Sequence, residues 1–229
     1  MSFNKSDSPF MWSGFSTKWY RVLVDSPEII EGFKNTLIVA VLSTVIAVVL
    51  GTLLAVGLAR YQKSSILEAV ALTPAIFPDL ALAIGLLALF IAFNVSLGLH
   101  TVIIGHALFS SAFVTAIVRG RLSQIDSSLE EAAQDLGDSA MGAFFRITLP
   151  SIKPAIVAGA LLAFTLSLDE FVLAFFTDGP STPTLPIIIY SMVRFGVSPE
   201  INALATVVLL TSVALIAIAQ RSIKMRDQI

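Results

Sequence analysis

Cysteine is absent from this chain of 229 residues, and charged side chains are scarce, at 13% of the total. The missing thiols exclude disulfide bonds and thiolate metal sites. No glycine is followed by lysine, so the chain has no Walker-type phosphate loop, and it contains no HExxH or GxSxG motif. The net charge is −2, and no basic tract suggests binding to nucleic acid. The sequence therefore predicts no enzyme, no cofactor and no metal site, and any ATP must be hydrolysed by another polypeptide.

Apolar residues are abundant instead. They make up 56% of the chain, and the mean hydropathy is +0.88, whereas ordinary soluble domains are about 45–50% apolar and about 25% charged. A helix of about 20 apolar residues crosses the hydrocarbon core, where only such a helix satisfies its own backbone. The stretches that meet this requirement are residues 37–58, 69–93, 101–118, 154–176 and 203–219. They predict an all-α integral membrane protein with about five transmembrane helices.

Lysine and arginine near the span ends predict the orientation, because cytoplasmic loops are enriched in both. If the spans alternate, most of these residues lie on one side. They are Arg60, Lys63, Arg119, Arg121, Arg146, Lys153, Arg221, Lys224 and Arg226. That side, with a tail over residues 221–229, is predicted to be cytoplasmic. The N-terminus then lies outside although residues 1–34 carry no export signal, so we expect a further helix upstream.

The transmembrane domain is predicted over residues 35–220, preceded by an amphipathic segment, 1–34, at the outer face of the membrane. This segment is rich in aromatic side chains, which favour the membrane interface. They are Phe10, Trp12, Phe15, Trp19 and Tyr20. An interface anchor is the simpler interpretation, and a contact with an external partner is the alternative.

A polar stretch between the third and fourth predicted spans is the most informative feature. Ser127 and Glu130 have the spacing of a capping box, which predicts a helix start. Gly137 can supply the left-handed residue that ends this helix, and Asp138 or Ser139 can cap the next one. The pattern predicts a helix-turn-helix elbow with exposed apolar side chains suited to a groove on a partner. An ordinary amphipathic hairpin between two spans is the alternative.

The elbow resembles the cytoplasmic loop signature of permease subunits of ABC importers. The signature residues here are Glu131, Ala132, Ala133, Gly137, Ile147, Leu149 and Pro150. The resemblance implies a loop, over residues 119–153, that couples the membrane helices to an ATP-binding subunit present in two copies. It also implies a second permease subunit and an extracytoplasmic substrate-binding protein, at the inner membrane of a bacterium.

Asp79, Asp169 and Glu170 are predicted inside the spans, where a carboxylate costs about 2.5–3.5 kcal/mol. Residues of this kind usually line a transport path, and we predict that role for these three. Asp169 and Glu170 are placed about two-thirds of the way along the fourth span. Adjacent helical residues point in different directions, so which of the two faces the path stays open. Protonation, or pairing with a hydroxyl group such as that of Thr165, is the alternative. His106 is predicted to pack between helices.

Residues 164–170 and 190–206 resemble permeases of spermidine/putrescine importers, and this likeness covers nearly the whole chain. Carboxylates along a path suit a polyamine cation, whereas an anion importer would present arginine or helix N-termini. Opines, iron complexes and other small organic cations are alternative substrates within the family. An ion-coupled secondary transporter is an alternative from a different class, which predicts inverted repeats that the sequence does not show. A membrane enzyme is a further alternative class, and the sequence shows no set of catalytic residues that would support it.

Overall fold

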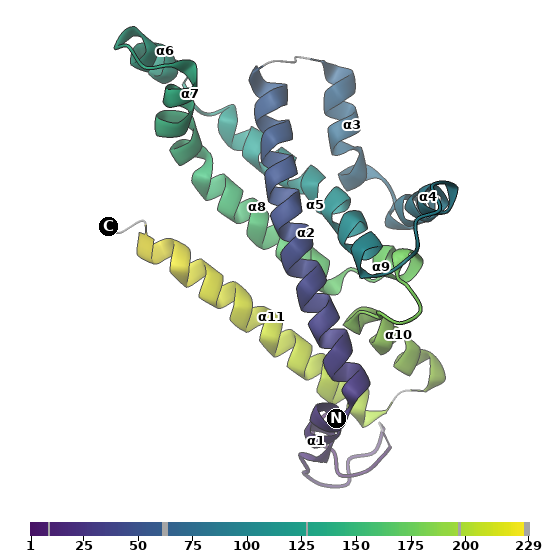
Figure 1. Ribbon diagram of the computed structural model, residues 1–229. Helices are drawn as coiled ribbons and strands as arrows, with labels where there is room; N and C mark the ends of the chain where they lie inside the picture. The colour runs from purple at the N-terminus through teal and green to yellow at the C-terminus, as the bar shows by residue number, and fades with distance from the viewer. Residues whose placement is uncertain (9, 61–63, 127, 197, 227–229) are drawn as a thin grey trace.

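The computed structural model describes residues 1–229 except 9, 61–63, 127, 197 and 227–229, with side chains described only as far as residue 214. Within these residues the chain is helical apart from loops and one β-bridge, between Asn4 and Phe15, so the all-α prediction is confirmed (Figure 1). The elements are α1 (Lys18–Asp25), α2 (Pro27–Arg60), α3 (Ser65–Ile76), α4 (Asp79–Ala92), α5 (Leu99–Leu122), α6 (Ser128–Asp135), α7 (Ala140–Ala143), a π-helix (Phe144–Thr148), α8 (Leu149–Asp169), α9 (Val172–Thr177), α10 (Leu185–Phe195) and α11 (Pro199–Arg226).

Three described helical stretches are long and apolar enough to cross a bilayer. They are Pro27–Arg60, Leu99–Leu122 and Ala140–Asp169. The first two contain the predicted spans 37–58 and 101–118, which are therefore confirmed as helices. The predicted span 203–219 lies within α11, and the part of α11 up to Ala214 is a shorter apolar helix.

The predicted span over residues 69–93 is a sharply bent pair of helices rather than one straight helix. The axes of α3 and α4 differ by 107°. Phe77 has an extended backbone, with ψ 144°, because the proline that follows it disfavours the helical conformation. Pro78 also lacks the backbone N–H that would continue the hydrogen bonds of the helix. The bend places Asp79 in the first turn of α4.

The predicted span over residues 154–176 begins earlier and ends earlier than expected. α7, the π-helix and α8 form one continuous stretch, Ala140–Asp169. Pro150 and Pro154 both lie inside this stretch, because the residues that precede Pro150 are already helical. The stretch ends where Glu170 adopts an extended conformation, with ψ 104°. The expectation that Asp169 and Glu170 lie two-thirds of the way along a span is therefore wrong, because α8 ends at Asp169.

α2, α5 and α8 pack together as the central bundle (Figure 1). Small and β-branched residues predominate where they meet. The buried set is Ala47, Ala55, Val114, Val118, Ile152 and Ala163. Gly51 is a point of close approach between α2 and α5, because a Cβ placed there would lie 2.7 Å from Val114 Cβ and 2.8 Å from the carbonyl oxygen of Ser111. Small residues at helix crossings allow this proximity in membrane proteins.

A buried polar contact also links the three bundle helices. Nδ1 of His106, in α5, lies 2.8 Å from the hydroxyl oxygen of Ser167 in α8, and that hydroxyl lies 3.2 Å from Ser43 in α2. All three side chains are buried. Hydrogen bonds between helices satisfy polar groups that hydrocarbon cannot. His106 thus has the helix-packing position that the sequence predicts.

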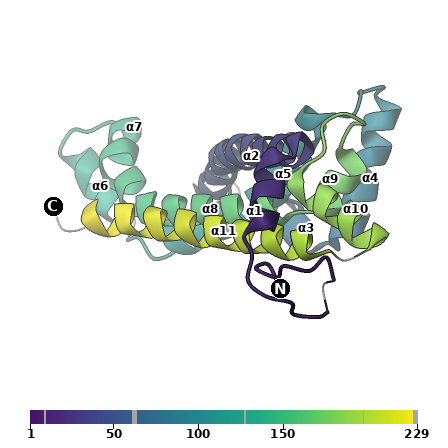
Figure 2. The same cartoon turned by 90° about the horizontal axis from the view of Figure 1, so that it is seen from below.

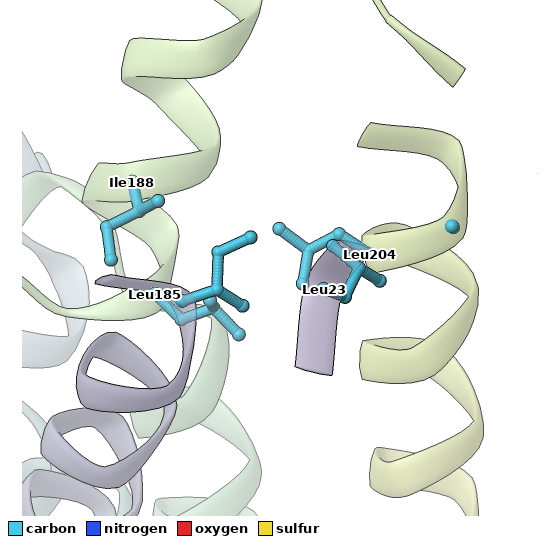
Figure 3. Packing of buried hydrophobic residues seen from close by; sticks show 6 residues of the cluster. Leu23, Leu185, Ile188 and Leu204 are labelled. Atoms are coloured by element: carbon cyan, nitrogen blue, oxygen red, sulfur yellow. The ribbon is translucent and has the colours of Figure 1, made fainter. Parts of the chain in front are cut away.

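The N-terminal segment packs against the end of the bundle opposite the elbow. Leu23 of α1 lies in a buried apolar cluster with Leu185 and Ile188 of α10 and Leu204 of α11 (Figure 3). The preceding loop closes around the buried side chain of Asn4. Residues 27–34, predicted as part of an outer segment, form the first two turns of α2.

Aromatic residues of the N-terminal loop remain exposed, as an interface anchor requires. Phe10 is 82% exposed and Trp12 is 58% exposed. Trp19 instead points inward and donates a hydrogen bond from Nε1 to the carbonyl oxygen of Asn4, at 2.8 Å. The contact of this loop with a membrane interface stays a prediction.

Candidate functional site

The elbow, residues 128–150, has the helix-turn-helix geometry that its sequence predicts. Gly137 has φ +96°, the left-handed conformation that glycine adopts without strain. The hydroxyl of Ser139 accepts a hydrogen bond from the N–H of Gly142 at 3.0 Å and so caps α7. Ser127 lies outside the described residues. At the start of α6 the N–H of Ser128 donates to the carboxylate of Asp126 at 2.9 Å, and this contact holds the pKa of Asp126 below its usual range.

The outer surface of the elbow is apolar and exposed. Its large side chains are Leu129, Leu136, Met141 and Phe145, and Leu136 is 91% exposed. Among the signature residues, Glu131, Ala132, Gly137 and Pro150 are exposed, and Ala133, Ile147 and Leu149 are half-buried. Leu149 packs against the apolar cluster of the central bundle. The signature therefore combines an outward-facing set with an inward-facing set that attaches the elbow to the helices.

Arg60, the last residue of α2, joins the elbow to the central bundle. Its Nη2 donates a hydrogen bond to the buried hydroxyl of Thr148 at 2.8 Å and forms an ion pair with Glu130 of α6. Its guanidinium carbon lies 4.9 Å from the centroid of the Phe144 ring. A planar guanidinium can form ion pairs and stack on a ring at the same time, which lysine cannot do equally well. One side chain thus contacts both α6 and the π-helix.

A continuous helical stretch connects the elbow to Asp169. Ala140–Asp169 contains 30 residues, which correspond to about 45 Å at 1.5 Å per residue. Its π-helix lies directly against Arg60, and π-helical insertions occur frequently at functional sites. The elbow and the α9–α10 region lie at opposite ends of the molecule in both views (Figures 1 and 2). Motion of the elbow therefore has a direct structural route to the far end of α8.

The three acidic residues predicted for the path have different surroundings. An Oε1 atom of Glu170 accepts a hydrogen bond from the N–H of Leu173 at 3.0 Å and thereby caps α9. α4, which begins at Asp79, packs against α9, the helix that Glu170 precedes. Asp169 is exposed and lines a cavity of about 390 Å³.

The cavity beside Asp169, which we call the Asp169 cavity, lies between the end of α8, α10 and α11. Its lining is otherwise apolar or aromatic. The residues are Leu168, Asp169, Phe171, Leu185, Pro186, Ile189, Tyr190, Val193 and Val208. The rings of Phe171 and Tyr190 are 4.7 Å apart between centroids, and Phe171 also packs on Phe175 at 5.3 Å. The cavity therefore combines one carboxylate with aromatic faces.

Sequence reasoning missed two contributors to these sites. From the sequence, Arg60 is only one of the basic residues that predict the orientation, because its partner Glu130 lies 70 positions away. Tyr190 served only as part of a family resemblance. A basic residue that ends a long apolar helix, opposite a loop rich in acidic residues, is the one local signal that points to Arg60.

A bundle of apolar helices that carries an anchored elbow at one end defines a subunit of a membrane transport system. The chain belongs to the family of binding-protein-dependent transport system inner membrane components, whose family model matches residues 47–228. It is therefore a transport subunit and not an enzyme, and the resemblance to permeases of ABC importers is confirmed. Family membership also excludes the secondary transporter as the class of this protein.

Curated relatives cover most of the chain. The putrescine transport system permease protein PotI of Escherichia coli (strain K12) is 41% identical over 217 residues, which are 91% of this chain and 77% of PotI. The spermidine/putrescine transport system permease protein PotC of the same organism is 39% identical over 221 residues, which are 96% of this chain and 84% of PotC.

Solved structures have the same fold at low identity. A bacterial ABC transporter involved in alginate import superposes with a TM-score of 0.75 at 17% identity, covering 93% of this chain and 85% of that chain. The MetNI methionine ABC transporter superposes with a TM-score of 0.66 at 20% identity, covering 91% and 95%. These likenesses concern the fold alone.

Proposed function

We propose that this chain is a permease subunit of a polyamine ABC importer and forms half of its translocation path, with putrescine and spermidine as substrates. The names of the two E. coli relatives support this substrate class. The observation that carries the mechanism is the continuous stretch Ala140–Asp169, because it links the exposed elbow to a carboxylate at the other end of the helix. A displacement of the elbow would thereby reach the place where a cation passes.

The elbow is the contact with the ATP-binding subunit, of which two copies serve a pair of permeases. Exposed Leu136 and Met141 can enter an apolar groove, in the way an amphipathic helix binds a partner. Ala132 lets the partner's backbone approach closely. The residues assigned to coupling are Glu131, Ala132, Ala133, Gly137, Ile147, Leu149 and Pro150.

Asp169, Glu170 and Asp79 give the path a negative character that suits a cation. Asp79 begins α4 and Glu170 precedes α9, two helices that pack together, and Asp169 lines the Asp169 cavity. A second permease subunit supplies the other half of the path, and an extracytoplasmic binding protein delivers the substrate at the α9–α10 end.

The protein spans the inner membrane of a bacterium with the elbow and the C-terminus in the cytoplasm. Basic side chains gather at the elbow end, where Arg60 contacts the elbow and Arg119 pairs with Glu68 of α3. Positive charge at the span ends favours the cytoplasmic side. The C-terminal end of α11 lies on the side of α6 in both views (Figures 1 and 2).

Thiol labelling in intact cells tests this orientation. The chain has no cysteine of its own, and Ser139 and Ser181 are both exposed. A membrane-impermeant maleimide added outside should label Ser181→Cys and leave Ser139→Cys unlabelled until the cells are permeabilised. The opposite pattern would reverse the orientation and would separate the elbow from the ATP-binding subunit.

Uptake of radiolabelled putrescine and spermidine by proteoliposomes that contain the complete complex tests the function. Uptake should require ATP and the binding protein, and an ATPase subunit that binds but cannot hydrolyse ATP should reduce it to background. Uptake driven by an ion gradient without ATP would contradict the proposal. Uptake of an opine or an iron complex, with neither polyamine transported, would show that the substrate class is wrong.

A further inference from the structure

Of the adjacent carboxylates Asp169 and Glu170, Asp169 is the exposed one that lines the cavity. The neighbouring Glu170 already accepts a backbone hydrogen bond from Leu173. Among the described residues, no side chain forms an ion pair with Asp169. An exposed carboxylate without an ionic partner can pair with a cation that enters the cavity, because opposite charges a few ångströms apart attract each other.

The aromatic walls of the Asp169 cavity favour an organic cation. Phe171 and Tyr190 lie beside Asp169 in the lining, and their ring centroids are 4.7 Å apart. The face of an aromatic ring attracts a cation within about 6 Å of its centroid. Tyr190 is 44% exposed, so part of its side chain is open to a ligand.

The size and the remaining walls of the cavity suit a short alkyl chain. The volume of about 390 Å³ is that of a small-molecule site. Ile189 and Val208 present apolar surface, against which methylene groups would be buried. An anion would be repelled by Asp169, which has no basic side chain beside it in the lining.

A metal ion fits this lining poorly. Hard divalent cations take about six or more oxygen ligands, whereas the cavity offers one carboxylate and the tyrosine hydroxyl. Among the described residues, no three or more His, Cys, Asp or Glu side chains lie together in a group that could hold a metal ion.

We propose that the Asp169 cavity binds the primary ammonium group of a linear alkylamine. The ammonium pairs with the Asp169 carboxylate, and the first methylene groups lie against Phe171 and Tyr190. This inference rests on the proposed function for its place on the path. It assigns the substrate contact to Asp169 and gives Glu170 the separate role of capping α9.

Protection of a cysteine from labelling measures binding without transport. Val193 lines the cavity and is 46% exposed, and Val193→Cys can be introduced into a complex whose other subunits have been made cysteine-free. Saturating putrescine should slow labelling of this cysteine at least about tenfold, because most of the cavities are then occupied. The matched neutral probe, 1,4-butanediol, has the same chain length and should leave the labelling rate unchanged.

Variants then identify the groups responsible. In the Val193→Cys background, Asp169→Asn should abolish protection by putrescine, and Glu170→Gln should retain it. Tyr190→Leu removes the ring and should raise about tenfold the putrescine concentration that gives half-maximal protection. Tyr190→Phe keeps the ring face and should leave this concentration nearly unchanged. Ser181→Cys, at an exposed position that does not line the cavity, serves in the same complex as the control for a general effect of the amine, and putrescine should not change the rate at which this cysteine is labelled.

The outcomes separate this inference from the proposed function. Protection by putrescine that depends on Asp169 supports the ammonium site even if the complex transports another solute. Equal protection by putrescine and 1,4-butanediol, or full protection in Asp169→Asn, would overturn the site. If the complex imports putrescine and the Asp169→Asn variant imports it with unchanged rate and KM, the ammonium site is wrong while the proposed function stands.

Discussion

Replacing Arg60 with alanine should lower polyamine uptake about tenfold or more, while the permease still inserts into the membrane. The change removes the ion pair with Glu130, the hydrogen bond to Thr148 and the contact with the Phe144 ring. Hydrogen bonds to charged groups contribute about 1.5–3 kcal/mol each. The elbow would then lose its attachment to α2, and movement of the ATP-binding subunit would no longer reach the central bundle in full. Binding-protein-stimulated ATP hydrolysis, uptake and co-purification of the ATP-binding subunit measure the effect.

Matched variants distinguish this contact from a general loss of positive charge. Lys153→Ala removes an exposed basic residue near the elbow and should transport at the parental rate. Arg60→Lys keeps the charge but loses the planar group, so it should give an intermediate rate. Exchange of the pair, Arg60→Glu with Glu130→Arg, should recover part of the uptake lost in Arg60→Glu alone. Parental uptake and parental stimulated ATP hydrolysis in Arg60→Ala would show that this contact does not transmit the coupling.

Gly51→Leu should markedly reduce the yield and thermal stability of the folded permease. Even the Cβ of the new side chain would lie 2.7 Å from Val114 Cβ and 2.8 Å from the carbonyl oxygen of Ser111. A backbone oxygen cannot move aside as a flexible side chain can, so α2 and α5 would have to separate. Overpacking of this kind costs about 1–3 kcal/mol or more. It would also strain the hydrogen bond from the Thr115 hydroxyl to the Gly51 carbonyl, at 3.3 Å.

Gly57→Leu is the matched control on the same helix. A Cβ at Gly57 meets no atom within 4 Å, so this variant should keep the parental yield and melting temperature. Size-exclusion chromatography in detergent after heating gives the fraction that stays folded at each temperature. Equal melting temperatures for Gly51→Leu and Gly57→Leu would contradict the close crossing of α2 and α5.

The local geometry of the elbow and the main spans were determined by the sequence itself. The left-handed turn at Gly137 and the cap at Ser139 depend on residues within a few positions of one another, so their chemistry can be predicted without knowledge of the rest of the chain. The apolar stretches within α2 and α5 are equally local, because the thickness of the bilayer sets their length. Pro78 accounts locally for the interruption of the stretch over residues 69–93, but the size of the 107° bend depends on how α4 packs against α9.

The tertiary structure decided how these parts are connected. The partners of Arg60 are remote in sequence, and no spacing rule links a residue to positions 70 and 88 further along the chain. Pro154 carries a helix-start signal, but the helix is continuous from Ala140, so neither Pro150 nor Pro154 begins it. Asp169 and Glu170 are adjacent carboxylates with the same local chemistry. They differ because α8 ends between them. Asp169 lies in the cavity lining with the rings of Phe171 and Tyr190, whereas the carboxylate of Glu170 accepts a hydrogen bond from the backbone of α9. These different surroundings depend on the packing of α8, α9, α10 and α11, so they cannot be predicted from the residues next to Asp169 and Glu170 in the sequence.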